Sequence, residues 1–499
     1  MNLQRVHTDR LLPKPAQGLA LLLALICNVV SAQTLNDQSE PAPAAAGQTD
    51  EQGAAAVAVV PDESVLMTPE EQLDDAQARF LGYYEDELYQ SALTAGRQVL
   101  QLAREIYGNN SVPVALALIN IANTQSKLGD LPAARGDFER SIYLIEDAEG
   151  VVSPRLINPL MGLAATHNAL GDYDRGLTAY KRALRINHVE LGLKNMEQMA
   201  IRDGITESYV GLGDMDEADF QQEAQVRIIR DKYGNDLEAL LPATYKLAEW
   251  YRRSGQPEKE SLLLQNAVRT VKQVSGDDSV KQIEALRGMA SAYQRLDMPA
   301  ECLRALKRAL RISEETEPED RLLTAEIQVE IGDFYNGFGD QREARDYYQR
   351  AWVTLAGENA TDAQQRYFGA PVIISSVDLP QVYPMNSKTS RLYLEDPDRF
   401  AEGQLLLRYN VDENGRVDDI KIVESNPPDL MDKRISYLLG RFLYRPRLVE
   451  GEPVLTANID ARHRFSYLRP DAEKSAEKGD ENAANDNADG RLSYPEQEE

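Results

Sequence analysis

The sequence predicts a mostly α-helical protein in which seven helical hairpins form a solenoid and a small α+β domain follows. Two observations predict this architecture. Turn signals recur every 42 residues between positions 87 and 339, and a fixed period of this length is typical of stacked repeats. After Pro371 the hydrophobic period changes from helical to alternating, which is typical of β-strands.

Residues 1–32 have the features of a secretory signal peptide. Three basic residues precede an apolar run over residues 18–30, and Val30-Ser31-Ala32 has small residues where a signal peptidase cuts. We therefore expect cleavage after Ala32. The run is shorter than the ~20 apolar residues that span a bilayer, so an inner-membrane anchor over residues 18–30 is the alternative.

The chain carries a formal net charge of −27, and removal of residues 1–32 would make it more negative. An acidic surface repels phosphate backbones and anionic lipid headgroups. We expect neither nucleic acid nor a membrane surface as a partner, and no integral membrane span after cleavage. Cys302 would be the remaining cysteine, so no intramolecular disulfide could form.

Three segments lack the periodicity of folded elements. Residues 33–68 are rich in Ala, Pro, Gln, Glu and Gly, a composition that cannot form a core and predicts a disordered linker. Residues 357–380 are expected to be a second linker. Residues 469–499 are acidic and nearly free of aliphatic side chains, which predicts a disordered tail.

Each hairpin within residues 69–356 has a turn between its two helices, and five of the seven turns contain Gly, which favours the left-handed conformation that ends a helix. The turn positions are Glu87, Gly129, Gly171, Gly213, Gly255, Asp297 and Gly339. A mostly small residue stands five positions after each turn, where two helices must approach closely. These residues are Ala92, Ala134, Gly176, Ala218, Glu260, Cys302 and Ala344.

This pattern resembles the tetratricopeptide repeat (TPR), most clearly from Ile331-Gly332 through Gly339 and Ala344 to Ala351. Because TPR units usually have about 34 residues, the longer unit must extend the second helix or the link to the next hairpin. Stacked units of this type leave a groove lined by their first helices. The resemblance therefore implies a surface that binds proteins or peptides.

Residues 381–468 have the pattern strand, strand, helix, strand. The first strand alternates over residues 405–411, and Asn414-Gly415 predicts a hairpin turn into the second. Asp429 is expected to cap a helix with one apolar stripe. The stripe consists of Met431, Ile435, Leu438, Leu439 and Phe442. The last strand has its apolar phase at Leu455, Ala457, Ile459, Ala461, His463 and Phe465.

At a series of short motifs this domain resembles the C-terminal domain of the energy transducer TonB, with an insertion between Pro384 and Gly403. The motifs are Tyr383-Pro384, Glu402-Gly403-Gln404, Asp412 with Gly415-Arg416-Val417, Ser425 with Pro427, and Phe442-Leu443-Tyr444-Arg445-Pro446. The resemblance implies that the last strand pairs with an added peptide strand or with a second copy of the chain. The edge residues would be Leu455, Thr456, Ala457, Asn458, Ile459, Asp460, Ala461 and Arg462.

The groove lining can be estimated by transferring the TPR first-helix positions two, three, six and ten residues ahead of the turn. In the fifth and sixth units these are Tyr245, Glu249, Arg252 and Arg253, then Arg287, Ser291, Gln294 and Arg295. Four arginines could clamp an acidic segment or a free C-terminus. They could equally pair with neighbouring carboxylates, or the acidic tail could occupy the groove.

No arrangement of residues predicts a catalytic, cofactor or metal site. The three histidines beyond residue 32 (His167, His188 and His463) do not have the spacing of metal ligands. We therefore expect a non-enzymatic periplasmic adaptor whose partners are proteins or peptides of the cell envelope, such as an outer-membrane receptor. The first alternative is a TonB-type energy-transducing component that stays in the inner membrane and acts on outer-membrane transporters. The others are an enzyme of the cell envelope and a Tyr-rich groove that holds a glycan instead of a peptide.

Overall fold

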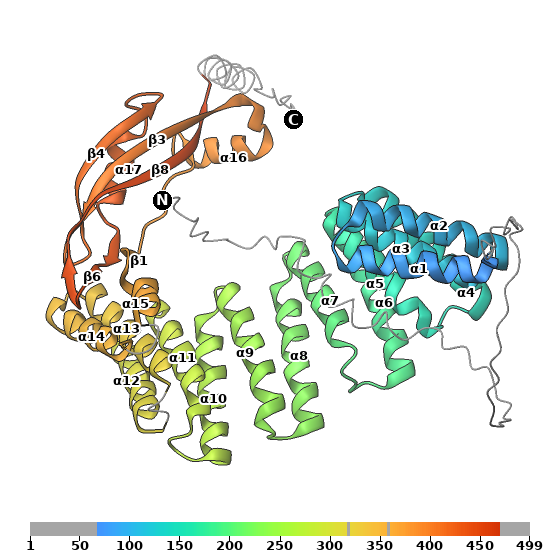
Figure 1. Cartoon of the computed structure of the whole chain (residues 1–499), viewed down its shortest axis with the longest axis horizontal. Coiled ribbons are helices and arrows are strands. Elements are labelled where there is room, and N and C mark those ends of the chain that lie inside the picture. The colour runs from blue at the N-terminus through green and yellow to red at the C-terminus, as the bar shows by residue number, and fades with distance from the viewer. Residues whose placement is uncertain (1–66, 317–319, 357–359, 470–499) are drawn as a thin grey trace, which may run out of the picture. The chain divides into compact units, whose positions relative to one another are not determined.

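The computed structural model describes residues 67–316, 320–356 and 360–469 (Figure 1). It consists of two compact units that meet in the sequence between Arg253 and Ser254. Across the described ranges, no helix combines the length and the apolar character that a membrane crossing needs.

The N-terminal unit contains four helical hairpins and one further helix. The helices are α1 (Pro69–Glu85), α2 (Tyr89–Tyr107), α3 (Val112–Leu128), α4 (Leu131–Glu149), α5 (Ile157–Ala169), α6 (Tyr173–Leu191), α7 (Met199–Leu212), α8 (Met215–Tyr233) and α9 (Leu237–Arg253). Each helix packs against the next one along the chain. Buried residues from α2 to α8 form one core that continues from hairpin to hairpin, and the first hairpin adds two smaller clusters.

The C-terminal unit begins with the same helical pattern. Its helices are α10 (Pro257–Ser275), α11 (Ile283–Arg295), α12 (Pro299–Thr316), α13 (Arg321–Gly337), α14 (Gln341–Thr354) and α15 (Ala360–Phe368). Hairpins α11–α12 and α13–α14 pack in sequence, with α10 against α11. The mostly helical, repeat-based fold predicted from the 42-residue period is therefore confirmed.

The turns within the hairpins explain why Gly-Asp recurs in the sequence. All seven turn residues have positive φ, from 55° at Asp297 to 82° at Gly129. In three units the following aspartate accepts a hydrogen bond from the backbone N–H three residues later and so caps the second helix. These residues are Asp130, Asp214 and Asp340. The glycine ends one helix and the aspartate begins the next.

A second glycine series accounts for the length of the repeat. Helices α2, α4, α6, α8 and α10 each have 19 residues, and each ends at a glycine with positive φ. These glycines, Gly108, Gly150, Gly192, Gly234 and Gly276, also recur every 42 residues. The additional length over a usual TPR unit therefore lies in the second helix and in the linker that follows it.

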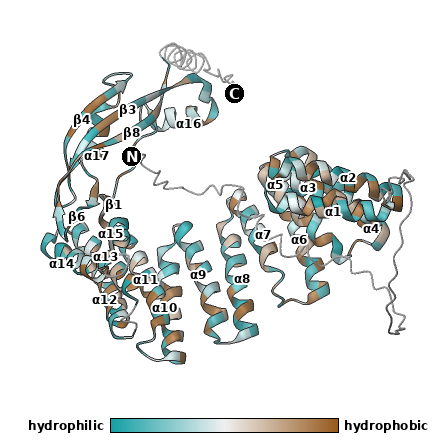
Figure 2. Ribbon diagram, in the orientation of Figure 1, coloured by the Kyte–Doolittle hydropathy of each residue, from teal (hydrophilic) through white to brown (hydrophobic). Residues whose placement is uncertain are grey.

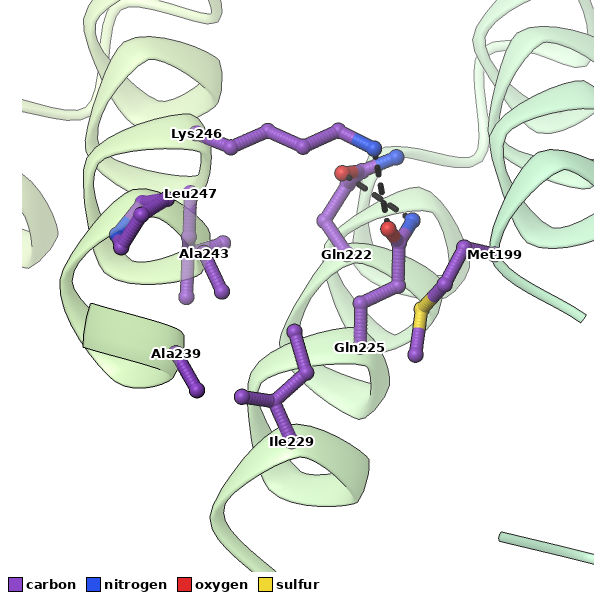
Figure 3. Close-up of a pocket in the computed structure, with 9 residues that line it drawn as sticks. Met199, Gln222, Gln225, Ile229, Ala239, Ala243, Lys246 and Leu247 are labelled. Carbon is purple, nitrogen blue, oxygen red and sulfur yellow. Dashed lines mark hydrogen bonds between the residues drawn. The ribbon is translucent and has the colours of Figure 1, made fainter. Parts of the chain in front are cut away.

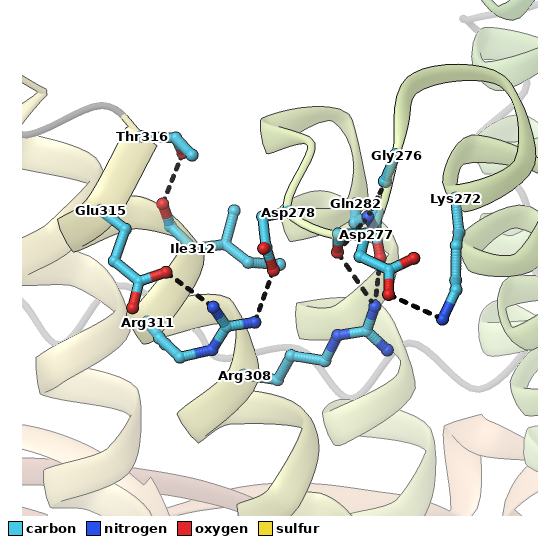
Figure 4. Close-up of polar contacts among 10 residues, drawn as sticks. All are labelled: Lys272, Gly276, Asp277, Asp278, Gln282, Arg308, Arg311, Ile312, Glu315 and Thr316. Atoms are coloured by element: carbon cyan, nitrogen blue, oxygen red, sulfur yellow. Dashed lines mark hydrogen bonds and ion pairs between the residues drawn. The ribbon is translucent and has the colours of Figure 1, made fainter.

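Polar side chains fix these linkers, as the segment between α10 and α11 shows (Figure 4). Gln282 donates hydrogen bonds to the carbonyl oxygens of Gly276 and Asp277 at 3.0 and 2.8 Å. Its own amide oxygen accepts a hydrogen bond from Arg308 at 2.6 Å. Gln198, two units earlier, binds its linker carbonyls in the same way. The linkers are thus part of the folded repeat.

At three junctions, successive hairpins are also locked together by a bulky side chain against a glycine. The side chain stands nine residues after one turn and the glycine nine residues before the next turn. A Cβ at Gly162 would lie 2.3 Å from Phe138 Cζ, and one at Gly204 would lie 2.1 Å from Tyr180 Cζ. Leu264 contacts Gly288 in the equivalent way in the C-terminal unit. Only glycine permits this close approach.

The C-terminal domain contains eight strands and two helices. They are β1 (Val372–Ser375), β2 (Val382–Tyr383), α16 (Ser387–Glu395), β3 (Phe400–Val411), β4 (Val417–Asn426), α17 (Asp432–Leu439), β5 (Leu443–Arg445), β6 (Arg447–Val449), β7 (Glu452–Val454) and β8 (Thr456–Leu468). The main sheet has the order β2-β8-β3-β4. The ribbon of β3 carries both apolar and polar residues (Figure 2), and burial alternates along the strand. Leu405, Leu407 and Tyr409 pack with Ile435 and Leu439 of α17 in one core.

Several details of this domain differ from the sequence predictions. Asp429 has a φ of 65° and α17 begins at Asp432, so Asp429 is not the cap. Asn458 also has positive φ, which interrupts the predicted alternation, and Leu455 lies outside β8. Residues 357–380, expected as a linker, include α15 and β1, and the insertion after Pro384 forms α16.

The burial of His463 predicts a pH-dependent loss of stability in this domain. Burial lowers the pKa of His463, although its contact with the Pro380 carbonyl oxygen raises it. The unfolded chain therefore binds a proton more readily, and stability should fall as pH drops below about 6.5. Amide exchange of β8 at pH 7.5 and 5.5 measures the effect. His463→Gln should reduce the pH dependence, and an unchanged pH dependence would contradict this assignment.

Candidate functional site

A pocket of about 260 Å³ lies between α7, α8 and α9 in the N-terminal unit (Figure 3). It is lined by Met199, Gln222, Gln225, Ile229, Ala239, Pro242, Ala243, Lys246 and Leu247. Most of these side chains are apolar, and the polar ones stand together on one side. The pocket is larger than the roughly 150 Å³ cavity that holds benzene, so it can take a group the size of a large amino-acid side chain.

The pocket lies at a junction that lacks the bulky side chain and the glycine of its two neighbouring junctions. At this junction the position nine residues after the turn is Gln222, whereas the second and third units have Phe138 and Tyr180. The position nine residues before the next turn is Lys246, in place of glycine. Ala243 is also small, whereas the same position two units later is the buried Ile327. These three side chains line the space that remains between α8 and α9.

A hydrogen-bonded wall closes one side of this pocket. Asp203 accepts hydrogen bonds from Lys246 Nζ at 2.7 Å, Gln222 Nε2 at 2.9 Å and Gln225 Nε2 at 2.7 Å. Lys246 Nζ also donates to Gln225 Oε1 at 2.9 Å (Figure 3). The charges of Lys246 and Asp203 balance each other. The wall positions polar groups but presents no unbalanced charge to a ligand.

Asp203 stands ten residues before its turn, which is one of the groove positions expected from the TPR resemblance. The same position two units later is Arg287, and it makes an equivalent contact with opposite charge. Arg287 donates to Glu330 Oε1 at 3.0 and 2.6 Å, whereas Asp203 accepts from Lys246. In both cases the partner belongs to the next first helix. In these two units, the residue ten positions before the turn therefore links its helix to the next first helix by an ion pair.

The last hairpin shows that such a first-helix surface can hold an extended segment. Asp333, six residues before the turn, accepts two hydrogen bonds from Arg445 of β5, at 2.9 Å from Nε and 2.6 Å from the terminal nitrogen. Asn336, three residues before the turn, donates to the Tyr444 carbonyl oxygen at 2.9 Å. Asp333 therefore binds a side chain of β5, whereas Asn336 binds its backbone.

This contact is largely buried. Burial alone would lower the pKa of Arg445, but the hydrogen bonds and charge of Asp333 outweigh it and hold the pKa above its usual value. Leu448 of β6 completes the apolar core around Tyr348 and Phe368. The C-terminal domain thus docks on the last hairpin through a charged contact, a backbone contact and an apolar contact.

The residues predicted to line the groove of the fifth and sixth units lie on α9 and α11. Arg252 forms an ion pair with Glu249 on its own helix, and Arg253 is exposed at the end of α9. Tyr245 is half-buried. On α11, Arg287 pairs with Glu330 and Glu326, as described for position ten.

The remaining predicted groove residues, Ser291 and Gln294, are exposed. Arg295 pairs with the buried carboxylate of Glu260 on α10. Three of the four arginines therefore have carboxylate partners, which favours the interpretation that they stabilise the helices. The clamp for an acidic segment stays a prediction, and the acidic tail lies outside the described residues.

The predicted edge strand is partly covered. β8 pairs with β3 along one side over most of its length. On the other side β2 pairs only with Ser466 and Tyr467, and within residues 360–469 no other strand pairs with this edge. The stretch from Thr456 to Arg462 therefore keeps an open side. Arg408 and Asp460 form an ion pair across β3 and β8.

Two further titratable side chains, Cys302 and His167, are buried outside these surfaces. Cys302 is buried, and burial raises its pKa to about 11, so the thiol stays protonated at neutral pH. Burial also lowers the pKa of His167. Within the described ranges, no group of His, Cys, Asp and Glu side chains is arranged to hold a metal ion.

Comparison with known proteins identifies part of the repeat. Comparison with curated proteins gave no match. Similar solved structures include a Podosopora anserina protein of nearly identical TPR-like repeats (18% identity, TM-score 0.33, 40% of this chain and 96% of that chain). Another is the C-terminal part of a TPR repeat-containing protein from Cytophaga hutchinsonii (12%, 0.37, 58% and 98%). A third is the apo form of the quorum sensor NprR from B. thuringiensis (12%, 0.30, 58% and 85%). Residues 281–351 match the family model described as Tetratricopeptide repeat, so this stretch of the chain carries tetratricopeptide repeats.

Proposed function

We propose that this protein is a non-enzymatic adaptor that binds extended peptide segments of other proteins on the first helices of its repeats. The contact of Asp333 and Asn336 with β5 carries the proposal. Its two contacts use the positions three and six residues before the turn, which the TPR resemblance assigns to ligand binding. An internal segment held at these positions is a model for how the other units would hold a partner.

Recognition of this kind combines backbone and side-chain contacts. An amide donor binds a carbonyl oxygen in any extended peptide, whereas a carboxylate selects an arginine or a lysine. Residues at the same positions differ between units, so each unit would select a different side chain. This arrangement suits an adaptor that recognises a defined sequence.

Selection from a random peptide library displayed on phage tests this proposal with the full chain. We expect enriched peptides that share a motif and bind with micromolar or better affinity. The matched comparison is the same selection against the urea-unfolded protein. Recovery of the same peptides from both samples, or of none from the folded chain, would reject the proposal.

The C-terminal domain is proposed to act as a TonB-type domain that adds a partner strand at the open side of β8. The geometry supports this because Thr456 to Arg462 pair with another strand on one side only. A second copy of the chain is the alternative occupant. Proline at position 460 would remove a backbone donor from this edge. Asp460→Pro should therefore abolish strand addition, and partner capture by this variant would refute the proposal.

We further propose that the protein acts in the periplasm after cleavage at Ala32. The support is the composition of residues 1–32, which lie outside the described residues. Mass spectrometry of the protein from its native envelope should find Gln33 as the first residue. An intact N-terminus would instead support the alternative in which residues 18–30 anchor an energy-transducing component in the inner membrane.

A further inference from the structure

We infer that the pocket between α7, α8 and α9 is an anchor site for one bulky uncharged apolar side chain of a bound peptide. The inference rests on the proposed peptide binding and adds the class of residue that is recognised. It is carried by a local difference in packing between this junction and its two neighbours. Tyr180 packs against Gly204 at the preceding junction and Leu264 against Gly288 at the following one, whereas Gln222 and Lys246 stand at these positions beside the pocket.

The size of the pocket limits its occupant. At about 260 Å³ it exceeds a benzene-sized cavity of roughly 150 Å³ and falls below the roughly 300 Å³ at which ligand and cofactor pockets begin. A leucine, methionine, phenylalanine or tryptophan side chain fits this range. A whole cofactor does not.

The chemistry of the walls limits the occupant further. Met199, Ile229 and Leu247 present hydrocarbon or thioether groups to the pocket. The one cation, Lys246, already binds both carboxylate oxygens of Asp203 and the amide oxygen of Gln225. A charged ligand would therefore lose its hydration without gaining a partner. An apolar side chain has no hydrogen bonds to water to lose, and it would gain van der Waals contacts with these walls.

The pocket lies beside the groove along which a peptide is expected to bind. Asp203, which forms the polar wall, stands at the groove position ten residues before its turn. A peptide that lies along the first helices would pass this wall and could insert one side chain beside it. The polar wall would remain intact, because its hydrogen bonds are satisfied without the peptide.

Single-residue probes test the pocket directly in the full chain. Methyl-labelled methionine provides the signal, and a Met199→Leu variant assigns the resonance of Met199. We expect N-acetyl-tryptophan amide and N-acetyl-leucine amide to shift this resonance saturably. N-acetyl-alanine amide and N-acetyl-lysine amide should not. Within a bound peptide, changing the anchor residue to alanine should weaken binding roughly 10- to 100-fold.

Ala243→Ile provides the blocking variant, because isoleucine is the residue that the repeat itself uses at positions 201 and 327. It should abolish the shift while the protein remains folded. Ala78→Ile, at an exposed position of α1, is the matched control and should leave the shift unchanged. If Ala243→Ile does not fold, the double variant Gln222→Tyr and Lys246→Gly, which restores the ring and the glycine, takes its place.

The outcomes separate this inference from the proposed function. A Met199 resonance that responds to no apolar amide, responds equally to the lysine amide, or still responds in the blocked variant overturns the anchor site. If library peptides nevertheless bind the full chain, peptide binding stands and only the anchor site is lost. If no library peptide binds, the proposed function fails as well.

Discussion

Arg445→Met is expected to lower the free energy of unfolding of the docked C-terminal domain by about 3 kcal/mol. The change leaves the Asp333 carboxylate without its cation, and the side chains of Arg445 and Asp333 are only 11% and 23% exposed. A buried charge that loses its partner is strongly destabilising. Urea unfolding followed by amide exchange at β5 would measure the loss.

The exposed ion pair between Arg408 and Asp460 is a matched control. It has the same two-pronged geometry, with distances of 2.7 and 3.0 Å, but its side chains are 42% and 44% exposed. Solvent screens such a pair, so Arg408→Met should change stability far less. The double variant Asp333→Asn and Arg445→Met should recover part of the loss. Equal effects of Arg445→Met and Arg408→Met would contradict the burial argument.

Gly204→Ala is expected to destabilise the N-terminal unit by roughly 1–3 kcal/mol. The new Cβ would lie 2.1 Å from Cζ of Tyr180, and this buried ring cannot move without displacing the contact between two hairpins. The loss should appear as a lower urea midpoint for the N-terminal unit.

Gly136→Ala is the control, and it is expected to change the free energy of unfolding in the opposite direction. Gly136 lies in the middle of α4, is exposed, and has no atom within 4 Å of the position of an added Cβ. Alanine should therefore raise stability by about 0.5–1 kcal/mol through its higher helix propensity. A stabilising effect of Gly204→Ala would show that the ring and glycine do not lock the hairpins.

The repeat could be predicted from the sequence because its signals are local. Turn residues such as Gly129 and Gly213 adopt positive φ because glycine has no Cβ. A fixed spacing of these glycines therefore predicts a fixed spacing of hairpins. The glycines that end the second helices, from Gly108 to Gly276, have the same 42-residue spacing and can also be recognised in the sequence. Their positions indicate that the second helix and its linker account for the longer unit.

The contacts that define the candidate site could not be predicted from local patterns. Asp333 and Arg445 are 112 residues apart. Although Arg445 belongs to one of the short TonB-like motifs, no local pattern indicates that Asp333 is its partner. The docking of β5 also depends on α15, in a segment without obvious periodicity. The pocket could have been found by comparing the equivalent positions of each unit, since Gln222 and Lys246 replace a ring and a glycine.

The predicted arginine cluster illustrates the limit of transferring positions from a family pattern. The transfer placed the correct residues on the first helices, but it could not show which carboxylates stand opposite them. Arg287 lies between Glu326 and Glu330 of the next first helix, because the 42-residue period brings positions ten and nine of neighbouring units together. Such pairing reduces the capacity of Arg287 to bind a partner.

Amide hydrogen exchange of the full chain with a library-selected peptide tests the central claim most directly. If peptides bind on the first helices, the peptide should slow exchange in α7 and α9, where the pocket lies, and leave the outer second helices α2 and α4 unchanged. Slowed exchange that is confined to second helices, or to parts of the chain away from every first helix, would contradict the account.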